Sequence, residues 1–291
     1  MTRVRAVRHV DAFTTAPLAG NPAAVVDGDG LDAAVMQRIA LNQHLSETVF
    51  LLPPADRAHH AHIRIFTPRT ELPFAGHPTI AATHILTEEG RAAPAAGEPL
   101  RIETGAGVVP VAVEGTPPLY TMTQAPPEFR ASPIALDAIA AAAGLAPGEV
   151  VRAEDVSTGI FWLIAQVTSL DAMLRVRPDA ALLRALHLAV FCVGAEAGDA
   201  DVHVRAFALP SGIAEDPVTG SANGCIAAFV ARHGLLRAEE GEIRYVAEQG
   251  AELGQPGRVR LRVTGVPDAL AVHVGGHAVT VLRGELLLPD A

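Results

Sequence analysis

The sequence predicts an α+β protein made of two similar, strand-rich halves, each with a sheet wrapped around one buried helix. Three observations lead to this fold class. Short segments of the first half recur in the same order roughly 140 residues later in the second half. Several of these segments alternate polar and apolar residues, as strands do. The helical run late in each half is apolar on nearly all sides, which indicates burial within the sheet.

The repeated segments give the elements of each half in chain order. A glycine opens each half, and an apolar strand then leads to a Leu-Asp pair at the start of a helical stretch. A second apolar strand and an alternating strand follow, and the last match is the buried helix. The matching pairs are GNPAAVVDGDGLD (20–32) with GIFWLIAQVTSLD (159–171), TVFLLPP (48–54) with AVFCVGA (189–195), IRIFTP (63–68) with VRAFALP (204–210), and GHPTIAATHILTEEG (76–90) with GSANGCIAAFVARHG (220–234). Each match is weak alone, but chance would not keep them all in one order.

The late helix of each half is predicted to begin at a glycine, Gly76 in one copy and Gly220 in the other. A helix start exposes unpaired backbone N–H groups and carries roughly half a positive charge, so it is suited to binding an anion. We expect the start with Gly76 and His77 and the start with Gly220 and Ser221 to point into one cleft between the halves. There they would hold a carboxylate and stabilise negative charge that develops beside it.

Hairpin and proline patterns set the expected domain boundaries. The segment at 101–114 predicts a hairpin, because glycines interrupt two alternating strands. A proline cluster, TPPLYTMTQAPP, then begins at Thr116 and indicates a linker. We therefore expect a first domain over 1–118 and a second domain over 119–278. A C-terminal strand over 279–291 is expected to return to the first domain.

Composition excludes several classes of protein. The net charge is −10, which argues against nucleic acid as a partner, because nucleic-acid binders concentrate positive charge. No run reaches the roughly 18 apolar residues of a membrane helix, and the N-terminus lacks the apolar core of a secretory signal. Two cysteines, Cys192 and Cys225, do not make a disulfide framework and are expected to lie in the core. We therefore expect a cytoplasmic protein with free thiols.

The sequence contains no lysine. Without lysine there can be no Schiff base to pyridoxal phosphate and no P-loop lysine on a nucleotide phosphate. Two large classes of enzyme are excluded.

Two acidic residues are candidates for moving protons. Glu47, in HLSETVF, breaks the repeat, because the matching stretch LHLAVF is apolar there. A carboxylate at the entrance of a strand is commonly solvated, but apolar neighbours would raise the pKa of Glu47 toward the value that a general base needs. Asp216, in AEDPVTGSANG, precedes the second late helix, where an ordinary Asp-Pro turn is the alternative interpretation. Together they would place one acid on each half of one cleft.

Other constellations are less complete. GSANG is not a nucleophile elbow, because Ser221 directly follows Gly220, so a hydrolase triad of Ser221, His77 and Asp216 is a minor alternative. HHAH at 59–62 is expected to place His60 and His62 on one face of a strand, but two imidazoles are too few ligands for a closed metal site, and no metal is predicted. His84 is expected to be a core or interface histidine.

Four segments, GNPAAVV, LSETVF, PFAGHPT and EDPVTGSANG, resemble the signature segments of the phenazine-biosynthesis isomerase family, the PhzF-like proteins. That family is related to diaminopimelate epimerase and proline racemase. The resemblance implies two pseudo-symmetric α+β domains, each a mostly antiparallel sheet curled around a central helix (diaminopimelate epimerase-like). It also implies a cofactor-independent enzyme that is usually a homodimer. By resemblance, the acid–base carboxylate falls on Glu47, and ligand contacts fall on Ser46, Gly76, His77, Asp216, Gly220 and Ser221.

The function expected from the sequence is proton-transfer isomerisation of a small carboxylate-bearing substrate, with Glu47 as the general acid/base. Two alternatives stay open at this point. One is a two-base epimerase or racemase that uses Glu47 and Asp216 from opposite faces. The other is a family member that binds a metabolite or protein without catalysis.

Overall fold

The computed structural model describes residues 3–93, 95, 97–266 and 269–288. The chain divides into two compact units. Unit 1 comprises Met1–Met122 with Gly276–Ala291, and unit 2 comprises Thr123–Gly275. The chain therefore leaves unit 1 once and returns to it. Of the C-terminal segment expected over 279–291, residues 289–291 lie outside the described part.

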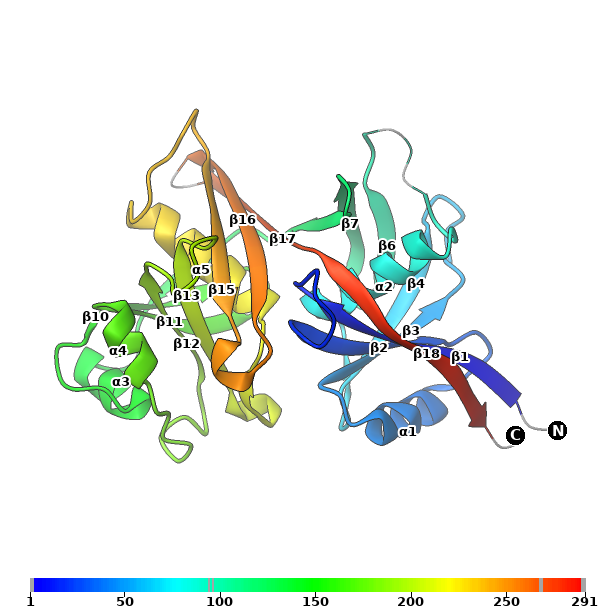
Figure 1. The fold of residues 1–291 in the computed structure, drawn as a ribbon, viewed down its shortest axis with the longest axis horizontal. Coiled ribbons are helices and arrows are strands. Elements are labelled where there is room, and N and C mark those ends of the chain that lie inside the picture. The colour runs from blue at the N-terminus through cyan, green and yellow to red at the C-terminus, as the bar shows by residue number, and fades with distance from the viewer. Residues whose placement is uncertain (1–2, 94, 96, 267–268, 289–291) are drawn as a thin grey trace. The chain divides into compact units, whose positions relative to one another are not determined.

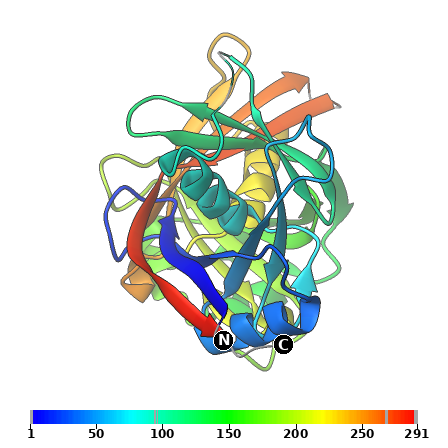
Figure 2. The same ribbon diagram turned by 90° about the vertical axis from the view of Figure 1, so that its right-hand side faces the viewer.

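Unit 1 contains one mostly antiparallel sheet (Figure 1). Neighbouring strands run antiparallel except for two pairs, β2 with β3 and β4 with β6, which are parallel. Figures 1 and 2 both show the last strand, β18, lying along β1. The strands are β1 (Arg3–Ala12), β2 (Asn21–Asp27), β3 (Glu47–Leu52), β4 (Ala61–Phe66), β5 (Glu71–Leu72), β6 (Leu100–Thr104), β7 (Gly107–Glu114), β8 (Leu119–Thr123) and β18 (Ala278–Leu288).

Unit 2 repeats this topology strand for strand. Here β11 with β12 and β13 with β15 are the parallel pairs, and the other neighbours are antiparallel. The strands are β9 (Glu128–Ala131), β10 (Val150–Ser157), β11 (Phe161–Val167), β12 (His187–Val193), β13 (Val202–Ala208), β14 (Ile213–Asp216), β15 (Ile243–Gln249), β16 (Gly257–Val266) and β17 (Ala269–Gly276). The shared pairing pattern explains the sequence repeat, because two copies of one fold need apolar strands in one order.

The two late helices begin where the sequence predicts. Helix α2 (Gly76–Glu88) begins at Gly76, and helix α5 (Gly220–Arg232) begins at Gly220. Shortly after each helix comes a glycine with positive φ, Gly90 after α2 and Gly234 after α5. Residues other than glycine rarely adopt this backbone conformation. Within unit 1, α2 contacts β1, β2, β3, β4 and β18, and within unit 2, α5 contacts β10, β11 and β16. The central helix of each sheet is thus confirmed.

Helix α2 carries threonines on buried faces without leaving their hydroxyls unpaired. Thr79 Oγ1 donates to Ala75 O at 2.7 Å, and Thr83 Oγ1 donates to Thr79 O at 2.8 Å. Each hydroxyl is satisfied by the preceding turn of the same helix. A polar side chain can therefore lie inside the sheet at little cost.

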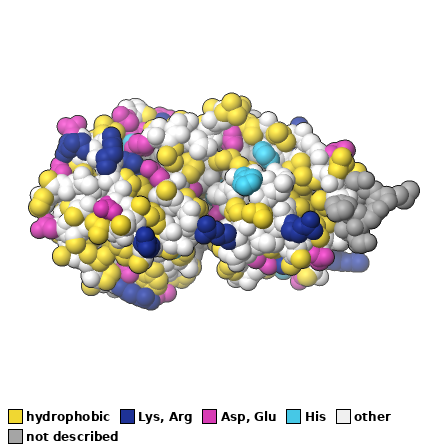
Figure 3. Space-filling model, turned by 90° about the horizontal axis from the view of Figure 1, so that it is seen from below, with side chains coloured by type: hydrophobic (Ala, Val, Ile, Leu, Met, Phe, Trp, Pro, Cys, Tyr) yellow, Lys and Arg dark blue, Asp and Glu magenta, His cyan; other side chains and the backbone are white. Residues whose placement is uncertain are grey.

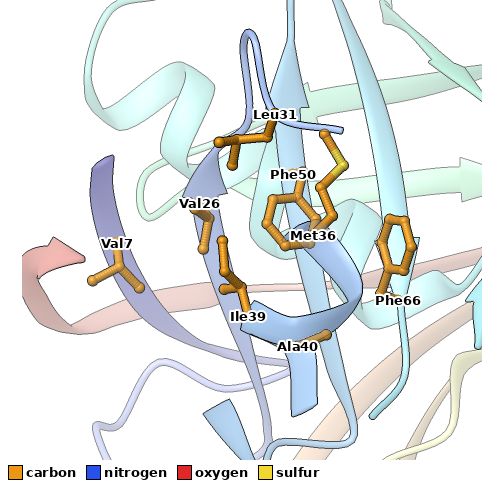
Figure 4. Packing of buried hydrophobic residues seen from close by; sticks show 8 residues of the cluster. All are labelled: Val7, Val26, Leu31, Met36, Ile39, Ala40, Phe50 and Phe66. Atoms are coloured by element: carbon orange, nitrogen blue, oxygen red, sulfur yellow. The ribbon is translucent and has the colours of Figure 1, made fainter. Parts of the chain in front are cut away.

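An early helix, α1 (Ala33–Gln43), covers the other face of the strands in unit 1. Asp32 caps it by accepting a hydrogen bond from Val35 N at 2.8 Å, and His44 ends it with a φ of 55°. Figure 4 shows the apolar side of α1 against the sheet, with the rings of Phe50 and Phe66 edge to face at 5.5 Å. The cluster comprises Val7, Val26, Leu31, Met36, Ile39, Ala40, Phe50 and Phe66. The remaining helices are α3 (Leu136–Ala143), α4 (Leu170–Arg175), η1 (Leu209–Ser211) and η2 (Ala251–Leu253).

Candidate active site

In unit 1, the structure brings Glu47 together with the start of helix α2. Glu47 is the first residue of β3, so the end of α1 at His44 and the Phe50 core fix its position. Its Oε2 lies 3.1 Å from Nε2 of His77, the second residue of α2, and both residues are buried, at 6% and 7% exposure. Ser46 Oγ lies 3.5 Å from the same imidazole nitrogen. Three of the residues named by the sequence therefore form one cluster.

The electrostatics of Glu47 differ from the sequence prediction. Burial raises the pKa of its carboxyl, as expected, but the opposing charge of His77, the close polar contact that its Nε2 makes with Oε2, and a hydrogen bond from Ser46 lower it below the ordinary 4.5. The prediction of a raised pKa is therefore wrong, because it considered only the apolar neighbours along the chain. The Glu47 side chain is therefore ionised at neutral pH and can accept a proton.

One oxygen of this carboxylate is poorly satisfied. Within the described residues, Glu47 Oε2 is buried and has no hydrogen bond of good geometry, although His77 lies close to it. A buried polar atom without a hydrogen bond is costly, and such atoms gather at sites that bind a ligand. This oxygen is where a substrate proton could be taken.

The start of α2 is open to an anion. Ala75, the residue before the helix, makes no capping hydrogen bond, because its methyl side chain has no hydrogen-bonding group. The first N–H groups of a helix have no partner inside the helix, and the capping residue gives those near Gly76 and His77 none in the described structure, so they can donate to an anion. The helix dipole favours a negative charge there.

In unit 2, Asp216 lies in a buried network rather than at an open position. Thr219 Oγ1 donates to Asp216 Oδ2 at 2.6 Å, and Gln249 Nε2 donates to Asp216 O at 2.8 Å. Asn223 Nδ2 in turn donates to Gln249 Oε1 at 2.8 Å. The network fixes the segment that leads from β14 into α5. Sequence reasoning found Asp216 but missed Thr219 and Gln249, because a glutamine on a distant strand carries no local signal.

The start of α5 is built differently from that of α2. Ser221, the second residue of α5, accepts a hydrogen bond from Trp162 Nε1 at 3.1 Å. The Trp162 ring lies 5.2 Å from the ring of His187, measured between centroids. Trp162 is the one tryptophan in the chain, and in the sequence repeat it falls opposite Ala23. That mismatch is the signal in the sequence that could have singled out Trp162.

The two helix starts therefore have the same backbone arrangement but different functional side chains. In the repeat, His77 corresponds to Ser221, and Glu47 corresponds to Leu188. Unit 1 offers a base and an imidazole, whereas unit 2 offers a hydroxyl held by an indole. For the hydrolase alternative, the described structure gives Ser221 a tryptophan partner rather than the imidazole that a nucleophilic serine needs.

A neighbour of Asp216 and the histidine predicted to lie in the core both have structural roles. Glu215, next to Asp216, forms a two-point ion pair with Arg205, both contacts at 2.8 Å. His84 is buried and contacts the hydroxyls of Tyr120 and Thr280, each at 3.1 Å, so its prediction as a core histidine is confirmed.

The cysteine, metal and membrane expectations bear on the class of protein. Both cysteines are buried and free, as predicted, and burial raises the pKa of Cys192 to about 11 and that of Cys225 to about 12.

In the part of the chain that is described, no group of three or more His, Cys, Asp or Glu is placed to hold a metal ion. His60 lies before β4, whereas the sequence pattern had indicated a place within the strand. No described helix is long and apolar enough to cross a membrane, and a cytoplasmic location stays a prediction. On the face drawn in Figure 3, basic and acidic side chains are scattered among apolar ones.

Comparison with known proteins gives one consistent result. A family model described as phenazine biosynthesis-like protein matches residues 10–284. The trans-2,3-dihydro-3-hydroxyanthranilate isomerase of Pseudomonas chlororaphis is 36% identical over 291 residues, which cover 96% of this chain and 98% of that protein. A crystal structure of a PhzF-family phenazine biosynthesis protein from Bacillus anthracis has a TM-score of 0.90 at 30% identity, covering 98% of this chain and 100% of the other.

A more distant neighbour shares the fold alone. A hydroxyproline epimerase from Agrobacterium vitis has a TM-score of 0.66 at 17% identity, covering 99% of this chain and 94% of that one. Together the comparisons confirm the resemblance found in the sequence and the epimerase-like α+β fold. They also confirm that the chain is an isomerase.

Proposed function

This chain belongs to the phenazine biosynthesis-like protein family, and we propose that it is a cofactor-independent isomerase. In this proposal the enzyme moves a proton between two carbons of a small carboxylate-bearing substrate. The observation that carries the proposal is the buried Glu47 carboxylate, whose Oε2 lies 3.1 Å from His77 and lacks a good hydrogen bond in the described structure.

Glu47 performs both proton transfers in this proposal. It removes a proton from one carbon, the electron pair moves along the conjugated system, and Glu47 returns the proton to a second carbon. Substrate and product then have the same composition, and no cofactor takes part. Because the pKa of Glu47 lies below 4.5, the side chain is ionised at neutral pH and can accept the proton; it is also a weak base, so the charge on the substrate must be stabilised as the proton leaves carbon. His77 would hold the charge of Glu47 and orient it between the two transfers.

The substrate carboxylate is assigned to the helix starts. Backbone N–H groups at Gly76 and Gly220, with the side chains of His77, Ser46 and Ser221, would bind it and stabilise charge as the proton leaves carbon. With no lysine in the chain, backbone donors have the larger share of this work. Charge stabilisation is needed because acid–base catalysis alone contributes about 10²- to 10⁴-fold.

Asp216 is assigned a positioning role in the one-base scheme. Its Oδ2 accepts the Thr219 hydroxyl at 2.6 Å, so this oxygen is engaged in holding the segment before α5. The two-base alternative, an epimerase or racemase that uses Glu47 and Asp216, would require Asp216 to exchange protons with the substrate.

The experiment is turnover of trans-2,3-dihydro-3-hydroxyanthranilate, the compound named for the Pseudomonas relative, in heavy water. It is run with the wild type and with Glu47→Gln and Asp216→Asn, alongside a panel of small cyclic and amino carboxylates. The one-base scheme expects Glu47→Gln to abolish isomerisation, with a smaller and more variable effect from Asp216→Asn. Comparable loss in both variants, with deuterium chiefly in an inverted product, would support the two-base alternative. Full turnover by Glu47→Gln would refute both.

The partners follow from the same proposal. We assign a small carboxylate-bearing molecule as the ligand and a second copy of the chain as the protein partner, with neither nucleic acid nor a membrane. Light scattering coupled to gel filtration measures the second assignment directly, since a monomeric mass at micromolar concentration would contradict the homodimer.

A further inference from the structure

We propose that Trp162 is a positioning residue, which fixes the hydroxyl of Ser221 so that its proton is presented to an anionic oxygen of the substrate. This rests on the proposed function, because it assigns a task to one residue of the same site. The substrate class it favours is one with a carboxylate, the anionic group of the proposed substrate.

The hydrogen bond determines the direction of the Ser221 proton. Trp162 lies in β11, is 4% exposed, and donates its indole N–H to Ser221 Oγ at 3.1 Å. An indole nitrogen donates and cannot accept, so the serine oxygen accepts here. Its own hydrogen is then left for a different acceptor, and Ser221 itself is only partly buried.

Among the described residues, no side-chain capping bond is seen at the start of α5. Thr219, in the capping position, makes no capping bond with its side chain: its hydroxyl donates to Asp216 Oδ2 at 2.6 Å, and its oxygen accepts from Gln249 Nε2 at 3.1 Å. The first N–H groups of α5 and the Ser221 hydroxyl are thus left as donors at the end of the helix that favours negative charge. An anion there would be bound by donors whose directions are already set.

Trp162 is itself held in place. Its ring lies 5.2 Å from the His187 ring, at an interplanar angle of 39°, and His187 Nε2 contacts Ser211 Oγ at 3.0 Å. In the repeat, Ala23 stands where unit 2 has Trp162, and Ala23 is completely buried. The same strand position can therefore be filled by a methyl group in this fold, so the indole is not a requirement of the sheet.

Because Trp162 is the only tryptophan, the protein has one indole N–H resonance, and this resonance reports the hydrogen bond without any assignment problem. We expect Ser221→Ala to move that resonance in the absence of ligand. Titration of the wild type with inorganic sulfate should move it in a saturable way, and Ser221→Ala should weaken that response. These measurements need no turnover and no variant of the tryptophan.

The functional arm compares Trp162→Phe, Ser221→Ala and the double variant. Trp162→Phe keeps an aromatic ring and removes the N–H, so we expect KM for trans-2,3-dihydro-3-hydroxyanthranilate to rise about 3- to 10-fold, the usual effect of one hydrogen bond. The value of kcat should stay within about twofold, because the proton transfers belong to Glu47. The double variant should raise KM no further than Ser221→Ala does alone, because both changes remove the same hydrogen bond. Tyr120→Phe, which removes a buried aromatic hydroxyl in unit 1, is the control and should leave KM unchanged.

The outcomes separate this inference from the proposed function. An indole resonance that Ser221→Ala leaves in place would overturn the inference, as would a Trp162→Phe enzyme with wild-type KM. In either case the function assigned to Glu47 would stand. Failure of the wild type to isomerise any member of the carboxylate panel would instead refute the proposed function, and the sulfate titration would still test the role of Trp162.

Discussion

Replacing Glu47 with glutamine tests the centre of the mechanism. A glutamine side chain would keep the size of the original, but it could not accept a proton from carbon. The exchange loses no well-formed hydrogen bond at Oε2, because within the described structure that oxygen has none. It does lose the attraction between the carboxylate and His77, 3.1 Å away, while it also removes a buried charge. These two effects oppose each other, so we expect the variant to fold.

The expected loss of turnover follows from the role of a general base. Such a group contributes about 10²- to 10⁴-fold, so kcat should fall by at least about 10²-fold, or about 2.7 kcal/mol in the activation free energy. Affinity for the substrate should change by less than about 1 kcal/mol, or roughly fivefold, because the carboxylate-binding donors are untouched. Steady-state turnover and calorimetric binding measure the two quantities separately.

The pH dependence gives a second readout of the same group. Since the pKa of Glu47 lies below the ordinary 4.5, the base is ionised throughout the neutral range. Activity of the wild type should therefore be level as pH falls through the neutral range, and the midpoint of the loss from protonation of Glu47 should lie below that ordinary value.

A matched control is available in the same unit. Glu103, on β6, also pairs with a histidine, since its carboxylate lies 2.7 Å from His59 Nδ1, but it holds the loop at 55–56. Glu103→Gln should keep turnover within about twofold. The mechanistic reasoning is refuted if Glu47→Gln and Glu103→Gln have the same kcat.

Three further predictions concern the framework. His203 is buried between Glu248 and Glu252, at 2.7 and 2.8 Å; burial lowers its pKa, but the two carboxylates outweigh that and raise it above 6.5. Its stabilising effect is therefore complete below about pH 6.5 and is lost as pH rises through the raised pKa. In denaturant titrations, His203→Gln should lower the free energy of unfolding by about 3 kcal/mol at pH 6 and by clearly less at pH 9. An equal loss at both pH values would contradict the raised pKa of His203. Phe50→Ala, in the cluster beneath α1, should lower the free energy of unfolding by about 3–5 kcal/mol, and a loss under about 1 kcal/mol would show that the cluster can repack. Cys225, completely buried and with its pKa raised to about 12, should resist alkylation by iodoacetamide at pH 8 in the native protein and react after unfolding; rapid native labelling would disprove its burial.

The sequence by itself determined the repeat, the order of the elements and the starts of both central helices. These features depend on local patterns, because alternation specifies a strand and a glycine at Gly76 or Gly220 marks the point where the chain turns into a helix. The break in the repeat at Glu47 also singled out the candidate base, since a charged residue among apolar strand positions has no packing reason to be there.

Only the tertiary structure decided how those residues interact. The contact of Glu47 with His77 reversed the expected direction of the pKa shift, and the partners of Asp216 and Ser221 come from strands far away in the sequence. Such contacts depend on strand register and on the side-chain directions of elements that meet only after folding. Periodicity describes each element alone, whereas the electrostatics and hydrogen bonding of a buried group depend on every element packed against it.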